Sequence, residues 1–335
     1  MLPVIPSSFT KGRAALRRVM ATATAMFALA AIAPASSQAA PMTRAYDLSW
    51  SIHVSQVARD ARQAKVWIAI PQTLPEQRVT RLEIESPYGH RLVRDATFHN
   101  QVAEIDVPNP PDSFTVSLLA HVERAPVESR PAKLSSKERA LYLRREALVS
   151  LSPRIHAIAD QIADTNHDRY EYVLSNMEYD KTAPGWGHGD SERACDVRKG
   201  NCTDFHSLFM SLSRAKGVPT VFEMGYPMDP KGETAQAGGY HCWAWFYDDA
   251  VKHWTPVDIS EARKHSDRAD FFFGHLDADR VTFSRGRDIV LPGMKGAPLN
   301  YLPVGAYVEV DGKTQSEGVG RLLTYKSSSL PPPRS

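Results

Sequence analysis

The stretch that decides the fold reads Gly200-Asn201-Cys202-Thr203-Asp204-Phe205-His206-Ser207-Leu208-Phe209. From this stretch on, apolar residues recur at helical spacing, at Phe205, Leu208, Phe209, Leu212 and Ala215. The next residues, Lys216-Gly217-Val218-Pro219, form a helix stop signal. We therefore predict an amphipathic helix whose first turn holds Cys202. Unpaired backbone N–H groups and the positive end of the helix dipole favour a thiolate there, and the same N–H groups can hold an oxyanion. An isolated cysteine is more often a buried structural residue, so it is the position at a helix start that favours a nucleophile.

A second motif surrounds His241, in the run Tyr240-His241-Cys242-Trp243-Ala244-Trp245. Its composition predicts a strand, and side chains alternate between the two faces of a strand. His241 and Trp243 then share one face, while Cys242 and Ala244 share the other. Cys242 is therefore predicted to be a core residue that faces away from His241.

A hairpin is predicted to bring a carboxylate to His241. If Asp248–Val251 forms its four-residue loop, Trp245 lies opposite Trp254 and His241 lies opposite Asp258. Directly opposed side chains have Cβ atoms about 4.5 to 5.5 Å apart, close enough for a carboxylate to hold an imidazole N–H.

Cys202, His241 and Asp258 together have the residue types of a nucleophile, its base and the group that orients the base. Taken alone, His241 is better explained as a strand histidine satisfied by a neighbour, and Asp258 as a carboxylate that caps a turn. Their coincidence with a cysteine at a helix start favours a thiol enzyme.

The rest of the chain divides into segments of different pattern. Short apolar-alternating runs between Tyr46 and Val122 predict an antiparallel β-sandwich, and the stretch 125–137, rich in proline and charge, predicts a linker. Helical spacing predicts helices within 148–163 and 169–177, and the glycine-rich segment 182–190 predicts a loop. We expect four parts: a signal peptide at 1–39, a β-sandwich domain at 40–130, a catalytic domain at 131–315 and a disordered tail at 316–335.

The N-terminal residues have the pattern of a secretory signal. Four basic residues precede an apolar run of small residues, and Ser37-Gln38-Ala39 fits a cleavage site. The run is shorter than the roughly 20 residues that cross a bilayer, which disfavours a membrane span. Cleavage after Ala39 removes four of the 40 basic residues and none of the 38 acidic ones, so the mature chain is slightly acidic. We expect a periplasmic or secreted protein without a transmembrane segment in the mature chain, and no basic block remains that would bind nucleic acid.

The pairing of the three cysteines is open. An odd number in an oxidising compartment leaves at least one thiol free, so if Cys202 is a thiolate, Cys195 and Cys242 are the possible disulfide. A zinc site of Cys195, Cys202, His206 and Cys242 is an alternative, although the spacings are not those of a zinc ribbon or finger. The more ordinary role for His206 is packing or hydrogen bonding beneath the helix. We expect no metal and no other cofactor.

These motifs resemble the transglutaminase-like superfamily, a branch of papain-like thiol enzymes, and are similar to exported bacterial members with an N-terminal β-domain. The resemblance rests on Gly200-Asn201-Cys202, Tyr240-His241-Cys242-Trp243 and Pro256-Val257-Asp258, and it covers about 148–310. It implies an α+β fold, with a helix-borne cysteine packed on the antiparallel sheet of a papain-like transglutaminase core, preceded here by the β-sandwich. It also implies Cys202 as nucleophile, His241 as base and then acid, and Asp258 as the residue that orients His241.

One site residue follows from the resemblance alone. Animal cross-linking members use a Trp indole N–H upstream of the cysteine to hold the oxyanion, which makes Trp186 a candidate for this role. Packing of Trp186 on the core is an equal alternative. The acidic loops of calcium-dependent members are not seen in this sequence, so a metal requirement is not implied.

The function expected is that of an exported thiol enzyme that acts on amide bonds through a Cys-His-Asp triad and a thioester intermediate. Hydrolysis, by a protease or amidase, is favoured over acyl transfer that cross-links, because a cross-linker needs an amine site that the sequence does not display. Peptides, protein side-chain amides and peptidoglycan peptides fit the same triad, and the oligomeric state is not indicated. The alternative is a catalytically silent binding or scaffold protein that keeps the fold.

Overall fold

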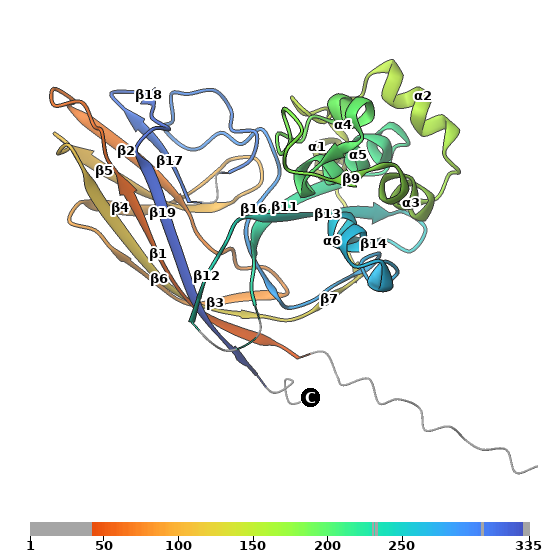
Figure 1. Cartoon of the computed structure of the whole chain (residues 1–335), viewed down its shortest axis with the longest axis horizontal. Helices are drawn as coiled ribbons and strands as arrows, with labels where there is room; N and C mark the ends of the chain where they lie inside the picture. The colour runs from red at the N-terminus through yellow and green to blue at the C-terminus, as the bar shows by residue number, and fades with distance from the viewer. Residues whose placement is uncertain (1–41, 230, 232–233, 303–304, 331–335) are drawn as a thin grey trace, which may run out of the picture. The chain divides into compact units, whose positions relative to one another are not determined.

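The computed structural model describes residues 42–229, 231, 234–302 and 305–330. The predicted signal peptide at 1–39 lies outside these residues. The described residues form an α+β fold with three five-stranded antiparallel sheets (Figure 1). Within this part of the chain, no helix is long and apolar enough to cross a membrane.

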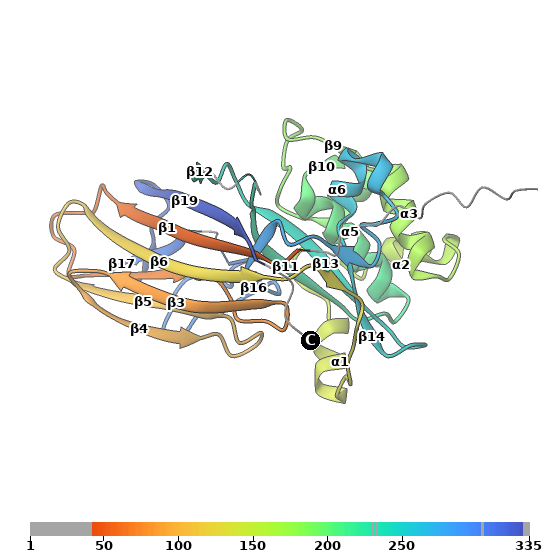
Figure 2. The same ribbon diagram turned by 90° about the horizontal axis from the view of Figure 1, so that it is seen from below.

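Two of the sheets face each other as a β-sandwich (Figure 2). The first sheet has the order β12 (Thr234–Gln236), β19 (Val319–Ser329), β1 (Arg44–Val54), β6 (Phe114–Arg124) and β3 (Gln77–Glu85). The second has the order β18 (Lys313–Thr314), β17 (Ala306–Val310), β2 (Gln63–Ala69), β5 (Gln101–Pro108) and β4 (Gly89–Arg94). Alternate side chains of β1, such as Trp50 and Ile52, are buried in one cluster with those of β2 and β5. The alternating runs therefore predicted this architecture correctly.

The C-terminal strands complete both sheets of the sandwich. β19 pairs with β1 along its whole length, from Ser329 opposite Arg44 to Val319 opposite Val54. The prediction of a disordered tail from residue 316 is therefore wrong for β19. The many serines and exposed polar residues of β19 made its alternating pattern, in which Leu323 is buried, hard to recognise in the sequence. The strand is ordered by its backbone pairing with β1, which its side chains do not indicate. The domain boundaries at residues 130 and 315 stay predictions.

The third sheet carries the site. Its order is β16 (Arg280–Arg285), β11 (Thr220–Pro227), β13 (His241–Asp248), β14 (His253–Val257) and β8 (Arg130–Pro131). Helix α5 (Cys202–Ala215) packs against β13, and Cys242, Ala244 and Phe246 belong to the core cluster that contains its buried side chains. Trp243, Trp245 and Tyr247 form a separate cluster on the opposite face, which α1 (Ser136–Leu143) covers (Figure 2). The predicted alternation along β13 is confirmed.

The remaining helices are α2 (Pro153–Gln161), α3 (Asn166–Asn176), α4 (Ser191–Val197) and α6 (Ile259–Lys264), with one turn of 3-10 helix at Ser266–Arg268. Helices α2 and α3 confirm the two that were predicted before α5. Two short ladders join β9 (Glu178–Tyr179) to β10 (Lys199–Gly200) and β7 (Val127–Glu128) to β15 (His275–Leu276).

The β13–β14 hairpin has a different register from the predicted one. Its four-residue loop is Asp249–Lys252 rather than Asp248–Val251, because Lys252 adopts a positive φ of 58° and remains in the turn. Each residue of β13 therefore faces a residue two places further along than predicted, and Trp245 lies opposite Pro256. The parity of the faces survives this shift, but the predicted cross-strand pair of His241 and Asp258 does not form.

Candidate active site

The site begins with the N-terminal cap of α5. Asn201 is the cap residue, and its side chain accepts a hydrogen bond of 2.9 Å from the backbone N–H of Thr203. Asp204 completes a capping box, since its carboxylate accepts the Asn201 N–H at 2.9 Å. Cys202 is the first residue of the helix and is only 2% exposed. The predicted helix start at Cys202 is confirmed.

Asp204 also joins α5 to the glycine-rich loop. Its carboxylate is fully buried and accepts the backbone N–H of Gly187 at 2.7 Å and that of Gly189 at 3.0 Å. Gly200 is required beside it, because a Cβ there would lie 2.2 Å from an Asp204 carboxylate oxygen. Burial raises the pKa of Asp204, while these backbone N–H groups act in the opposite direction. Sequence reasoning did not single out Asp204.

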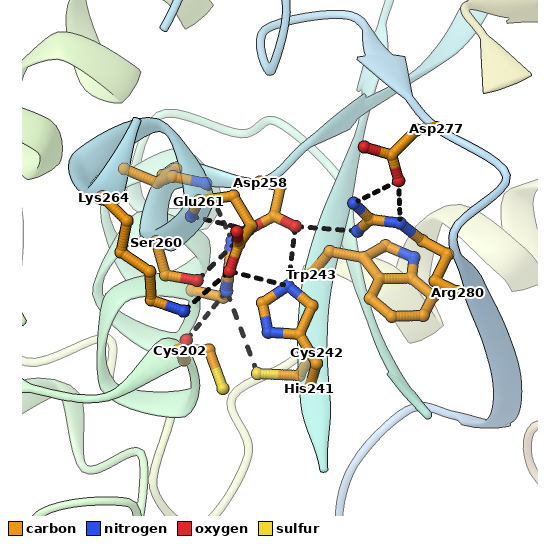
Figure 3. A network of polar contacts seen from close by, with 12 residues as sticks. Cys202, His241, Cys242, Trp243, Asp258, Ser260, Glu261, Lys264, Asp277 and Arg280 are labelled. Carbon is orange, nitrogen blue, oxygen red and sulfur yellow. Dashed lines mark hydrogen bonds and ion pairs between the residues drawn. The ribbon is translucent and has the colours of Figure 1, made fainter. Parts of the chain in front are cut away.

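His241 and Asp258 form a buried pair at the other side of the site (Figure 3). His241 Nε2 lies 2.7 Å from Asp258 Oδ2, although the two residues do not face each other across the hairpin. Strand β14 ends at Val257, and Asp258 is the N-cap of α6, where its Oδ1 accepts the Glu261 N–H at 3.1 Å. The predicted contact is therefore present, and a helix cap rather than strand register produces it.

The electrostatics of the site favour a thiolate and an imidazolium. Burial by itself raises the pKa of Cys202, but hydrogen bonds from Cys242 and His241, together with the charge on His241, hold it well below its usual range. Burial acts to lower the pKa of His241, and the charge of Asp258 and its hydrogen bond overcome this and raise it to about 10. With His241 Nε2 on Asp258, the other ring nitrogen is the one available to Cys202.

Cys242 belongs to this group of charges. It projects from the face of β13 opposite to Trp243, as the alternation predicted, and α5 lies on that same face. Its sulfur lies 3.7 Å from Thr203 Oγ1 and 3.9 Å from His206 Nδ1. Burial and the neighbouring Cys202 raise the pKa of Cys242, so Cys242 is the protonated partner. The sequence indicated a core residue and missed its contact with the nucleophile candidate.

His206 connects the starts of two helices. The Ile259 N–H donates to Nε2 at 3.1 Å, so the ring proton is on Nδ1, which donates to the Cys202 carbonyl at 2.8 Å. Burial lowers the pKa of His206 and keeps it neutral. The expected role in hydrogen bonding beneath the helix is confirmed.

The zinc alternative finds no support in this geometry. The His206 nitrogen that carries the lone pair accepts the Ile259 N–H, and among the described residues no three His, Cys, Asp or Glu side chains are grouped to hold a metal ion. Cys195, Cys202 and Cys242 are all free thiols, so the possible Cys195–Cys242 disulfide is not formed.

Trp186 lies on a rigidly held loop and is 37% exposed. Its neighbours Gly185 and Gly187 have φ values of 76° and 80°, which favour glycine. Besides Asp204, the loop is held by Arg287, whose guanidinium donates to the carbonyls of His188 and Gly189, both at 3.0 Å. The loop is thus fixed to α5 at the end that carries Cys202. The role of Trp186 as an oxyanion donor stays a prediction.

Arg280 is a further part of the site that the sequence did not reveal. It lies on β16, and its Nη1 donates at 2.7 Å to Asp258 Oδ2, the oxygen that also contacts His241 (Figure 3). An arginine in a strand-like run, 22 residues after Asp258, carries no signal that separates it from a surface arginine.

Comparison with known proteins shows that part of the chain matches a protein family model. Residues 150–259, which include Cys202, His241 and Asp258, match the family model described as the transglutaminase-like superfamily. This segment is therefore similar to transglutaminase-like domains. An uncharacterized protein of Haemophilus influenzae is 31% identical over 176 residues, which are 43% of this chain and 47% of that protein. The chain thus spans about half the length of that curated relative.

A solved structure supports the fold of the transglutaminase-like domain and of the β-rich part together. A crystal structure described as "a Putative Cysteine Protease from Cytophaga hutchinsonii" superposes with a TM-score of 0.57 and covers 89% of this chain and 93% of that chain. The sequence identity is 12%, so the likeness shows the fold alone.

Proposed function

We propose that this protein is an exported thiol enzyme that cleaves amide bonds through Cys202, His241 and Asp258. The observation that carries the proposal is the buried 2.7 Å contact between His241 and Asp258 beside a cysteine in the first turn of a helix. These groups favour a thiolate and an imidazolium near neutral pH, which is the reactive form of a cysteine–histidine pair.

In the first half of the reaction, the Cys202 thiolate attacks the amide carbonyl carbon and the carbonyl oxygen becomes an oxyanion. The Cys202 N–H is one of the groups that a helix start leaves without an intrahelical partner, and Trp186 is the candidate second donor. The His241 imidazolium then gives its proton to the amide nitrogen as the C–N bond breaks. The products of this step are a free amine and a thioester on Cys202.

In the second half, neutral His241 removes a proton from water, which attacks the thioester carbon. Breakage of the C–S bond restores the thiolate and releases a carboxylic acid, and His241 is again an imidazolium. Asp258 holds the imidazole through Nε2 in both steps. Attack by an amine in place of water would give cross-linking, and we propose hydrolysis because no amine site is evident.

Peptides, protein side-chain amides or peptidoglycan peptides are the substrate classes proposed, and the periplasm is the proposed compartment. One observation favours the second candidate, a catalytically silent binding protein: Cys202 is 2% exposed and His241 is 5% exposed, so substrate entry requires local movement. The two candidates differ in whether Cys202 can be acylated.

An acyl-amide probe that labels thiols tests the assignment. We expect wild type to be labelled and Cys202→Ala to be unlabelled. Cys195→Ala is the matched control, because Cys195 lies on α4 and burial raises its pKa to about 11, so its loss should leave labelling unchanged. Labelling that persists without Cys202 would exclude this nucleophile, and an unlabelled wild type with an alkylatable Cys202 would favour the silent protein. Exposure of periplasmic proteins and cell-wall peptides to wild type and Cys202→Ala then identifies the substrate.

A further inference from the structure

Arg280 is almost completely enclosed, with 3% exposure, and its donor groups are divided between two carboxylates. Nη1 donates to Asp258 Oδ2 at 2.7 Å, while Nε and Nη2 donate to Asp277 Oδ1 at 3.3 and 3.1 Å. The guanidinium also lies over the ring of Trp243, 4.9 Å from its centroid. A buried arginine with this many fixed contacts has one orientation, and in that orientation it contacts the carboxylate proposed to orient His241 (Figure 3).

We propose that Arg280 is a positioning residue that keeps Asp258 ionised and directed at His241 throughout the reaction. The inference rests on the proposed function of the same site. In this role Arg280 does not need to contact the substrate, because it acts through Asp258.

The geometry fixes both oxygens of the carboxylate. Oδ2 accepts from His241 and Arg280, while Oδ1 accepts from the Ser260 hydroxyl at 3.1 Å and from the Glu261 N–H at 3.1 Å. Rotation of the carboxylate would break contacts on both sides. Removal of Arg280 would leave His241 as the only donor to Oδ2. The orientation of this oxygen toward the imidazole would then no longer be held by a second hydrogen bond.

The charge of Arg280 matters most in the second half of the reaction. Burial acts against ionisation of Asp258, and the charges of His241 and Arg280 outweigh it and hold the pKa of Asp258 well below its usual range. Once His241 has given its proton to the leaving amine, one of these two charges is gone. Arginine remains charged under these conditions, so Arg280 is then the cation that keeps Asp258 an acceptor for the imidazole N–H.

Other charged groups around the pair do not substitute for Arg280. His206 lies 3.9 Å from Asp258 Oδ1 but is held neutral, and Lys264 is paired with Glu261 at 2.7 Å. Glu261 lies 3.9 Å from His241 Nε2 and adds negative charge. On the far side of Arg280, Asp277 is its second partner, burial and Asp277 raise the pKa of Asp279, and Arg124 is buried beside Glu76.

The test measures the rate at which iodoacetamide alkylates Cys202 as a function of pH, which requires no substrate and so separates this inference from the proposed function. In Arg280→Gln we expect the pKa of Asp258 to rise by about 1 to 3 units, the size of effect that an arginine has on an adjacent carboxylate. The acidic limb of the alkylation profile should move upward with it, because protonation of Asp258 removes the charge that holds His241 as an imidazolium beside the thiolate. Arg285→Gln is the matched control, because Arg285 lies on the same strand and forms a 2.9 Å pair with buried Glu223. It should destabilise the fold without moving the limb.

Arg280→Lys separates charge from geometry and serves if the glutamine variant does not fold. It keeps the charge but lacks the planar fork that holds two carboxylates in fixed directions. We therefore expect the acidic limb within about half a pH unit of wild type and thioester hydrolysis slowed at least tenfold. A folded Arg280→Gln protein whose limb coincides with wild type would overturn the inference. So would an Arg280→Lys protein whose thioester is hydrolysed at the wild-type rate.

Discussion

Replacement of Asp258 by Asn tests the charge arrangement most directly. The substitution keeps the size of the side chain and an oxygen that can cap α6, but it removes the negative charge that His241 Nε2 meets at 2.7 Å. Burial already acts to lower the pKa of His241, and Asp258 is the largest cause that raises it to about 10. Without the carboxylate, we expect that pKa to fall to its ordinary value of about 6.5 or below.

The magnitude follows from this fall. A change of more than three pH units corresponds to roughly 4 to 5 kcal/mol of lost preference for the imidazolium, at 1.36 kcal/mol per unit. Cys202 then loses its cationic partner, and its pKa moves up to the usual value of about 8.5 or higher. At pH 6 such a thiol is ionised to about 0.3%, so alkylation of Cys202 should slow by about 300-fold relative to a fully ionised thiolate.

The assay is the rate of Cys202 alkylation between pH 4 and 10, with the thiolate followed independently by ultraviolet absorbance. Asp277→Asn is the control, because Asp277 also contacts Arg280 but does not contact His241. Its profile should stay close to that of wild type. If Asp258→Asn and wild type gave the same profile, the thiolate would not be stabilised by the His241–Asp258 pair, which would refute the reasoning.

Three further predictions concern this pair and the residues around it. Cys242→Ala removes the S–H donor to Cys202, so the pKa of Cys202 should rise and alkylation at pH 6 should slow several-fold while thermal unfolding changes little; an unchanged rate would show that Cys242 only packs. Gly200→Ala places a Cβ 2.2 Å from Asp204, so it should lower the unfolding temperature and increase proteolysis of the loop 182–190. Neither effect is expected of the control Gly238→Ala, where a Cβ meets nothing within 4 Å. The pKa of His241 in the folded protein is above its usual 6.5, so its contribution to stability is complete below pH 6.5 and is lost as the pH rises through about 10. The difference in unfolding free energy between wild type and His241→Gln should therefore shrink across that range. A difference independent of pH would contradict the ion pair.

The sequence predicted the local parts of the site because local signals produce them. The start of α5 follows from a cap residue, a helical apolar period and a stop signal that all lie within 20 residues of Gly200. The faces of β13 follow from alternation, which survives a change of register by two residues. These features depend on neighbours in the chain, and a single sequence contains them.

The parts that the sequence missed depend on contacts between distant segments. Lys252 remains in the hairpin turn, so Asp258 reaches His241 as a helix cap and not as a strand neighbour. Arg280 arrives from two strands away, and nothing in its own run marks it. β19 owes its order to pairing with β1 and not to its own composition. In each case the residue types can be read from the sequence, but the fold determines which of them are in contact.

The pairing of β1 with β19 also has a consequence for the order in which the chain folds. On one side β1 pairs with β6, which begins 60 residues after β1 ends, but on the other side it waits for β19, the last described strand. A ribosome therefore releases the proposed catalytic residues before β1, the first described strand, has its second neighbour. Contacts between such distant segments form slowly, and until then β1 presents an open strand edge. For the exported protein that we propose, this delay would keep the chain in a state that can still be threaded through a membrane pore until β19 has been synthesised.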